Sequence, residues 1–150
     1  MKNNIFLNVV AAIFMLCLQD VYSQDLTAPA GVTSQLPFEK IQILLDKLNS
    51  VTSTATNLTA SALEELFSDK YLRNGVQKPQ RVIELTTPGS QYVLGYKASN
   101  PKVISCEADG ICKISYNESM GKYAGSATQY IIWNPDKDMW QYAGNQISVR

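Results

Sequence analysis

The segment VISCEADGICKISYN, residues 103–117, decides the fold class of this chain. Apolar and polar residues alternate on both sides of Ala108-Asp109-Gly110, and alternation with a period of two predicts β-strands. The three intervening residues place glycine where a hairpin loop needs a left-handed backbone. The segment therefore predicts two antiparallel strands, Val103–Glu107 and Ile111–Asn117.

The two cysteines of this segment define the register of the hairpin. A three-residue loop places Cys106 opposite Cys112, and the same register pairs Ile104 with Ile114 on that face. Directly opposed residues have Cβ atoms about 4.5–5.5 Å apart, so a disulfide can bridge the strands. The alternative is a redox-active or metal-binding pair, but two thiols without histidine or further cysteines make a poor zinc site. We expect a structural disulfide.

The period of two continues on both sides of the hairpin. Turn residues at Pro88-Gly89, Asn100-Pro101 and 134–138 separate the remaining apolar runs. Because the connections are short, the sheet should be antiparallel and sequential. The four further strands are predicted at Arg81–Thr87, Gln91–Lys97, Thr128–Trp133 and Met139–Ser148.

Helical periodicity precedes the strands. From Pro37 onward, apolar residues recur every three or four positions, which predicts a helix that ends near Asn49. Residues 50–59 are polar and small, and they predict a linker. A second helix should begin at the capping box Ser61-Ala62-Leu63-Glu64 and end at Asn74-Gly75.

These elements predict an α+β fold, with two N-terminal helices packed on a curved antiparallel sheet of about six strands. Residues 37–150 should form a single α+β domain. The helix that ends at Asn74-Gly75, followed by strands that close with the hairpin of Tyr130–Trp133 and Met139–Tyr142, resembles an NTF2-like domain. It is also similar to the related cystatin-like arrangement, in which a sheet wraps a helix. A small barrel with an N-terminal helical hairpin is the alternative architecture.

The N-terminus predicts export. A lysine at the second position, an apolar run over residues 5–18, and Val21 and Ser23 before the cut are typical of a signal peptide spanning residues 1–23. The run is shorter than the roughly 20 residues that span a bilayer, so we expect cleavage and no stable membrane anchor. Residues 24–36 lack periodicity and should form a flexible lead-in. The protein should be secreted or periplasmic.

Charge and composition exclude several classes of function. The 150 residues include 13 basic and 13 acidic side chains, so the chain lacks the excess positive charge typical of nucleic-acid binding. It contains no histidine, which excludes Ser–His and Cys–His nucleophiles and imidazole ligands for zinc. No catalytic residue, metal or cofactor is predicted. In a eukaryotic host, Asn57 and Asn117 would be glycosylation acceptors, since each lies in an N-x-S/T sequon.

The aromatic residues of the strand-forming half are the remaining candidates for function. Aromatic side chains favour half-buried sheet surfaces, so packing explains most of them, while a concave sheet would let some line a pocket or rim a partner surface. We expect a non-enzymatic binding module that holds a protein or a small apolar ligand on its sheet face or on the Trp133–Trp140 hairpin. The candidate binding residues are Tyr92, Tyr130, Trp133, Trp140 and Tyr142.

Two alternatives remain open. An NTF2-like pocket would hold a small ligand, or would act as an enzyme that uses Asp, Tyr or Lys in place of histidine. In addition, Gln91-Tyr92-Val93-Leu94-Gly95 is similar to the Q-x-V-x-G hairpin that cystatins insert into papain-type proteases. This resemblance implies a cysteine-protease inhibitor in which Gly31 and the Trp133–Trp140 region make the other wedge contacts.

Overall fold

The computed structural model describes residues 36–89, 92–107 and 110–146. The predicted signal peptide and nearly all of the predicted lead-in lie outside the described residues. No helix in the described part of the chain is long and apolar enough to cross a membrane. The helices are the 3-10 turn η1 (Phe38–Lys40), α2 (Ile41–Val51), α3 (Ala60–Leu66) and α4 (Lys78–Thr86). The strands are β1 (Phe67–Arg73), β2 (Val76–Gln77), β3 (Lys97–Cys106), β4 (Ile111–Met120), β5 (Tyr123–Asn134) and β6 (Met139–Gly144).

The six strands form one sheet in the order β2-β1-β6-β5-β4-β3. Strands β3 to β6 pair antiparallel with their sequential neighbours, as predicted, but β1 pairs in parallel with β6. The sheet is therefore mixed, and the prediction of a purely antiparallel sheet is wrong. Parallel neighbours need a long crossover connection, which α4 and strands β3 to β5 supply.

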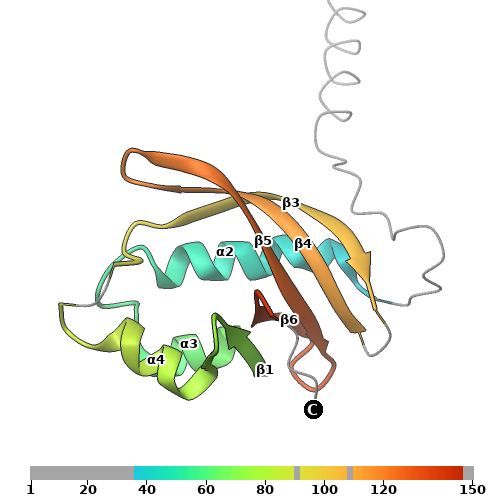
Figure 1. Ribbon diagram of the computed structural model, residues 1–150, viewed down its shortest axis with the longest axis horizontal. Helices are drawn as coiled ribbons and strands as arrows, with labels where there is room; N and C mark the ends of the chain where they lie inside the picture. The colour runs from blue at the N-terminus through green and yellow to red at the C-terminus, as the bar shows by residue number, and fades with distance from the viewer. Residues whose placement is uncertain (1–35, 90–91, 108–109, 147–150) are drawn as a thin grey trace, which may run out of the picture.

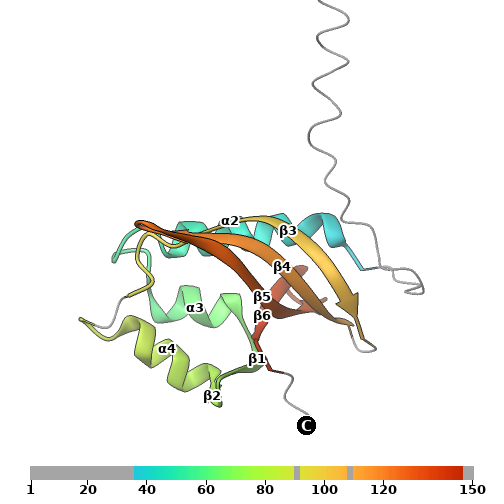
Figure 2. The same cartoon turned by 45° about the horizontal axis from the view of Figure 1, so that its top comes forward.

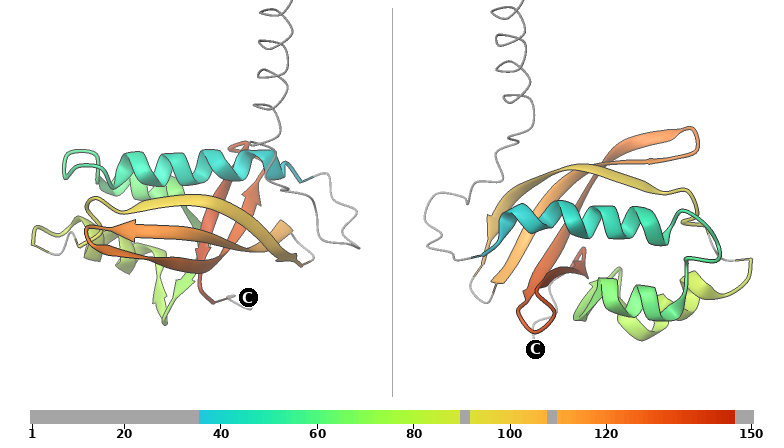
Figure 3. Two further views of the ribbon diagram at one scale, coloured as in Figure 1. Left: turned by 90° about the horizontal axis from the view of Figure 1, so that it is seen from above. Right: turned by 180° about the vertical axis from the view of Figure 1, so that it is seen from behind.

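The helices cover one face of the sheet (Figures 1 and 2). α2 runs across the sheet and packs against β3, while α3 and α4 lie beside each other next to β1. The right-hand view in Figure 3 shows the sheet arching over α2. The buried core fills the space between these layers. Its largest fully buried side chains include Trp140 and Tyr142 from β6, Tyr116 from β4, and Leu44 and Leu45 from α2.

α4 replaces a predicted strand. The alternation in Arg81–Thr87 predicts a strand, but all of these residues except the last belong to α4. Val82 and Leu85 are three residues apart and buried, whereas Ile83 is 65% exposed, so the apolar pattern is that of a helix face. Pro79 lies in the first turn of α4, where its missing N–H leaves no helical hydrogen bond unmade. The described part of the chain thus has three α-helices, one of them between strands.

β1 consists of residues that the second predicted helix should contain. α3 ends at Leu66, and the chain becomes extended at Phe67, whose ring stacks on that of Tyr71 with centroids 4.5 Å apart. Asn74 and Gly75 have φ of 52° and 80°, the left-handed pair of a two-residue hairpin loop between β1 and β2. The Asn-Gly sequence is therefore a hairpin turn and not a helix stop.

The bounds of both N-terminal helices also differ from the prediction. The first helix begins as η1 and continues as α2 to Val51, beyond its predicted end at Asn49. α3 begins before the predicted capping box, because the Thr59 hydroxyl accepts the N–H of Ala62 at 3.2 Å. Threonine at the N-cap satisfies one of the free N–H groups that every helix start exposes.

β3 differs from the prediction at both ends. Residues 92–95 form turns instead of belonging to a strand over Gln91–Lys97. The strand then continues through Asn100-Pro101, where a break was expected. Asn100 has a φ of 54°, and the register of β3 with β4 shifts between Ser99 and Lys102. A bulge therefore accommodates the proline in this edge strand.

The hairpin between β3 and β4 carries the predicted disulfide. Cys106 lies directly opposite Cys112, and the two sulfur atoms are bonded. A second bulge pairs Val103 with Ile114 and leaves Ile104 49% exposed. The disulfide prediction is confirmed, while the predicted pairing of Ile104 with Ile114 is wrong because the bulge turns Ile104 to the other face.

Candidate ligand cavity

A half-open cavity lies between the helices and the concave face of the sheet. It offers about 70 Å³ of space to solvent. Its lining comes from α2, α3 and α4, from strands β1, β4, β5 and β6, and from the segment just before β3. Because these segments are far apart in the sequence, the cavity is a product of the complete tertiary fold.

The helices give the cavity an apolar wall. Leu48 from α2, Leu63 from α3 and Leu85 from α4 all contribute to the lining. Leu63 and Leu85 are buried, with 1% and 4% of their surface exposed. This wall favours the apolar part of a bound molecule, because removing apolar surface from water stabilises a complex by roughly 25 cal/mol per Å².

The segment before β3 is held over the cavity by the end of α2. The Gly95 N–H donates to the Thr52 carbonyl at 2.8 Å, and the Thr52 hydroxyl donates to the Tyr96 carbonyl at 2.9 Å. Thr52 is itself buried. These two hydrogen bonds place Val93 and Tyr96 in the lining.

The sheet side of the cavity carries a chain of polar groups. Gln129 donates to the Tyr116 hydroxyl at 2.8 Å, and that hydroxyl lies 3.3 Å from the hydroxyl of Tyr96. Tyr96 in turn donates to the carboxylate of Glu118 at 2.7 Å. Burial raises the pKa of both tyrosines above the ordinary value, so their hydroxyls stay protonated at neutral pH.

Tyr142 lines the same cavity but has no hydrogen bond. It projects from β6, and its hydroxyl is buried without a partner among the described residues. Burial raises the pKa of this hydroxyl well above the ordinary value. Most buried polar groups in proteins have a partner, so an unpaired hydroxyl beside a cavity indicates a place for a polar atom of a ligand.

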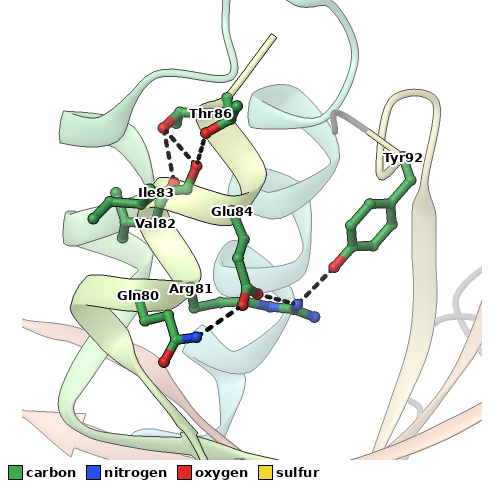
Figure 4. Close-up of polar contacts among 8 residues, drawn as sticks. Gln80, Arg81, Val82, Ile83, Glu84, Thr86 and Tyr92 are labelled. Atoms are coloured by element: carbon green, nitrogen blue, oxygen red, sulfur yellow. Dashed lines mark hydrogen bonds and ion pairs between the residues drawn. The ribbon is translucent and has the colours of Figure 1, made fainter. Parts of the chain in front are cut away.

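Arg81 contributes to the cavity lining from α4 (Figure 4). Its Nη1 donates to Glu84 at 3.0 Å and to the Tyr92 hydroxyl at 2.6 Å, and its guanidinium lies 5.7 Å from the Tyr92 ring centroid. Tyr92 is 54% exposed. The contact therefore joins α4 to the segment before β3 at the edge of the cavity.

Arg73 is the second cation of the lining, at the end of β1. It is partly buried, and none of the four ion pairs within the described residues includes it. Burial raises the pKa of Tyr71, and the positive charges of Arg81 and Arg73 oppose that rise. Both guanidinium groups thus lie close enough to the Tyr71 hydroxyl to interact with it. The lining contains two arginines and no acidic side chain.

The structure separates the five predicted binding residues. Tyr142 lines the cavity and Tyr92 contacts it through Arg81. Tyr130 is partly buried on β5, with the Lys113 ammonium 5.8 Å from its ring centroid. The two tryptophans lie together elsewhere, so the five residues do not form one site.

Trp133 and Trp140 pack at the η1 end of the molecule. Trp140 is fully buried, and its indole N–H donates to the Pro37 carbonyl at 2.9 Å. Its ring contacts Trp133 edge-on, with centroids 5.6 Å apart, and stacks on Phe38 at 6.0 Å. Lys40 lies 5.5 Å from the Trp133 ring centroid. These contacts join η1 to the β5–β6 hairpin.

Both sequon asparagines are exposed. Asn57 lies in the loop between α2 and α3, where its side chain donates to the Ser50 carbonyl at 3.1 Å. Asn117 lies within β4. Among the described residues, no group of three or more Cys, Asp or Glu side chains could hold a metal ion.

The sequence interpretation missed most of the cavity residues. Arg81 appeared to belong to a strand and Tyr71 to a helix, so their side chains were assigned to other faces. The spacing of Tyr71 and Arg73 is the signal that would have identified these two residues as neighbours, since residues two apart on a strand share a face. Comparisons with protein-family models, with curated proteins and with solved structures gave no match.

Proposed function

We propose that this protein binds a small ligand in the cavity on the concave face of its sheet. The observation that carries the proposal is the cavity lining, in which aromatic rings and leucines surround two arginines and the unpaired Tyr142 hydroxyl. Ligand sites combine a mostly apolar wall with a few convergent polar groups, and this lining has that composition.

Binding fits the lining better than catalysis does. The described residues that line the cavity include no Asp, Glu or Cys, and the chain has no histidine. The tyrosines of the lining have raised pKa values, which makes them weak acids and leaves no base near neutral pH. The arrangement positions a molecule but offers no group to accept its proton.

We also infer an NTF2-like arrangement. NTF2-like chains usually place another helix among the early strands, and α4 lies between β2 and β3. Export to a secreted or periplasmic location remains part of the proposal. The Cys106–Cys112 disulfide is compatible with an oxidising compartment.

The cystatin-like alternative receives less support from the same region. Residues 92–95 form turns, as an inhibitory hairpin tip would. However, Val93 lines the cavity and Tyr92 is bound to Arg81, so both side chains are engaged within the molecule. Under our proposal, the protein at micromolar concentration leaves the rate of papain unchanged, and a slowed rate would favour the inhibitor.

Nuclear magnetic resonance with small aromatic probes tests the proposed site. We expect benzoate or benzamide, added to the ¹⁵N-labelled protein, to shift amide signals of cavity residues. Val93→Trp should remove these shifts by filling the cavity. Ile83→Trp is the matched control, because Ile83 is 65% exposed on α4 and should leave the shifts intact. Shifts centred on Trp133 and Trp140 would overturn the proposal and favour the hairpin, and an absence of shifts with both probes would also overturn it.

A further inference from the structure

We propose that the ligand of this cavity is a small aromatic carboxylate whose anionic group binds Arg73. The inference rests on the proposed function and assigns the ligand its chemical class. It follows from the charge of the lining, from the state of the two arginines and from the shape of the walls.

The two arginines of the cavity differ in the hydrogen-bond and ion-pair partners that they already have within the protein. Arg81 has a carboxylate partner in Glu84 and a hydroxyl partner in Tyr92, at 3.0 and 2.6 Å. Arg73 is partly buried, its guanidinium interacts with the Tyr71 hydroxyl, and it has no carboxylate partner among the described residues. A guanidinium without a carboxylate partner can still form charge-assisted hydrogen bonds to an anion, so Arg73 is the cation of the lining that is open to one.

The surroundings of Arg73 favour an anion over a neutral group. No acidic side chain contributes to the lining, and Arg81 places a second positive charge beside the same tyrosine, Tyr71. A guanidinium offers parallel N–H groups that match the two oxygens of a carboxylate. The buried Tyr142 hydroxyl is available to donate to a ligand oxygen.

The walls select a small and planar ligand body. Phe67, Tyr71, Tyr96, Tyr116 and Tyr142 all line the cavity, which suits a ring that stacks or meets them edge-on. The space of about 70 Å³ accommodates only a small molecule and not a long acyl chain. Benzoate is a small planar ring that carries a carboxylate, and benzamide has nearly the same shape without the charge.

A comparison of these two probes on the Arg73 variants tests the inference. We expect the intact protein to bind benzoate at least about tenfold more tightly than benzamide, since hydrogen bonds to charged groups contribute more than neutral ones. Arg73→Gln should weaken benzoate binding about tenfold and change benzamide binding less than about twofold. Arg73→Lys should fall between, because it keeps the charge but loses the paired N–H groups. Lys122→Gln, on the exposed turn between β4 and β5, controls for the change in net charge.

The outcomes separate this inference from the proposed function. Equal affinity for the two probes at the cavity, or an equal loss of both on Arg73→Gln, would overturn the carboxylate and leave the ligand cavity standing. Binding of neither probe would overturn both. If Arg73→Gln fails to fold by circular dichroism, the Arg73→Lys variant decides: unchanged benzoate affinity there would contradict the paired hydrogen bonds.

Discussion

At the scale of single residues, Tyr142 combines a structural cost with the binding role that we propose for it. Its hydroxyl is buried and unpaired, and such a group costs about 1–3 kcal/mol of stability. Tyr142→Phe should therefore raise the free energy of unfolding by about 1 kcal/mol in urea titrations. Tyr116→Phe is the control and should lower it, because the Tyr116 hydroxyl accepts from Gln129. A destabilised Tyr142→Phe variant would contradict this account.

Gly144 is the residue at which the sheet is least tolerant of a side chain. Its φ is +90°, and a Cβ there would lie 2.0 Å from the Leu72 carbonyl oxygen. Gly144→Ala should lower the free energy of unfolding by about 3 kcal/mol or more, through backbone strain and overlap together. Gly121→Ala, which has a positive φ but open space, should cost only about 1 kcal/mol. Similar urea midpoints for the two variants would refute the close approach of β1 and β6.

At the scale of elements, the disulfide closes the hairpin of β3 and β4. The entropic model gives a loop this short about 2 kcal/mol of stabilisation. The double variant Cys106→Ser/Cys112→Ser should therefore melt at a lower temperature and still fold, as measured by circular dichroism. A double variant that does not fold at all would show that the disulfide has a larger role than stabilising one hairpin.

Local patterns predicted the elements whose partners are near in the sequence. The Cys106–Cys112 register followed from a three-residue loop, and the antiparallel run of β3 to β6 from short connections. The sequence of Arg81–Thr87 could not distinguish a helix from a strand, because a run of apolar residues this short fits either kind of element. Only the burial of Val82 and Leu85 together with the exposure of Ile83 shows that the segment presents a helix face. The cavity was missed for the same reason, since Tyr71 and Arg81 face it only once β1 and α4 are correctly assigned.

At the scale of the whole molecule, the buried tyrosines make stability depend on alkaline pH. Burial raises the pKa of Tyr96, Tyr116 and Tyr142 in the folded state, whereas tyrosines in the unfolded chain ionise near pH 10. The unfolded state therefore loses protons first, so stability is fully present below about pH 10 and falls as the pH rises beyond it. Urea midpoints should be similar at pH 7 and 9 and clearly lower at pH 11. An unchanged midpoint at pH 11 would show that these hydroxyls are accessible to solvent.

The parallel pairing of β1 with β6 also sets the order in which the molecule can fold. Phe67 of β1 lies beside Tyr142 of β6, so β1 can form this pairing only after β6, near the end of the domain, has been synthesised. Such distant contacts form slowly, because a long loop must close before it gains any contact. A nascent chain that ends before residue 139 has a free edge on β1 and lacks the β6 wall of the cavity. The proposed ligand cavity is thus complete only after β6 has been synthesised and has paired with β1.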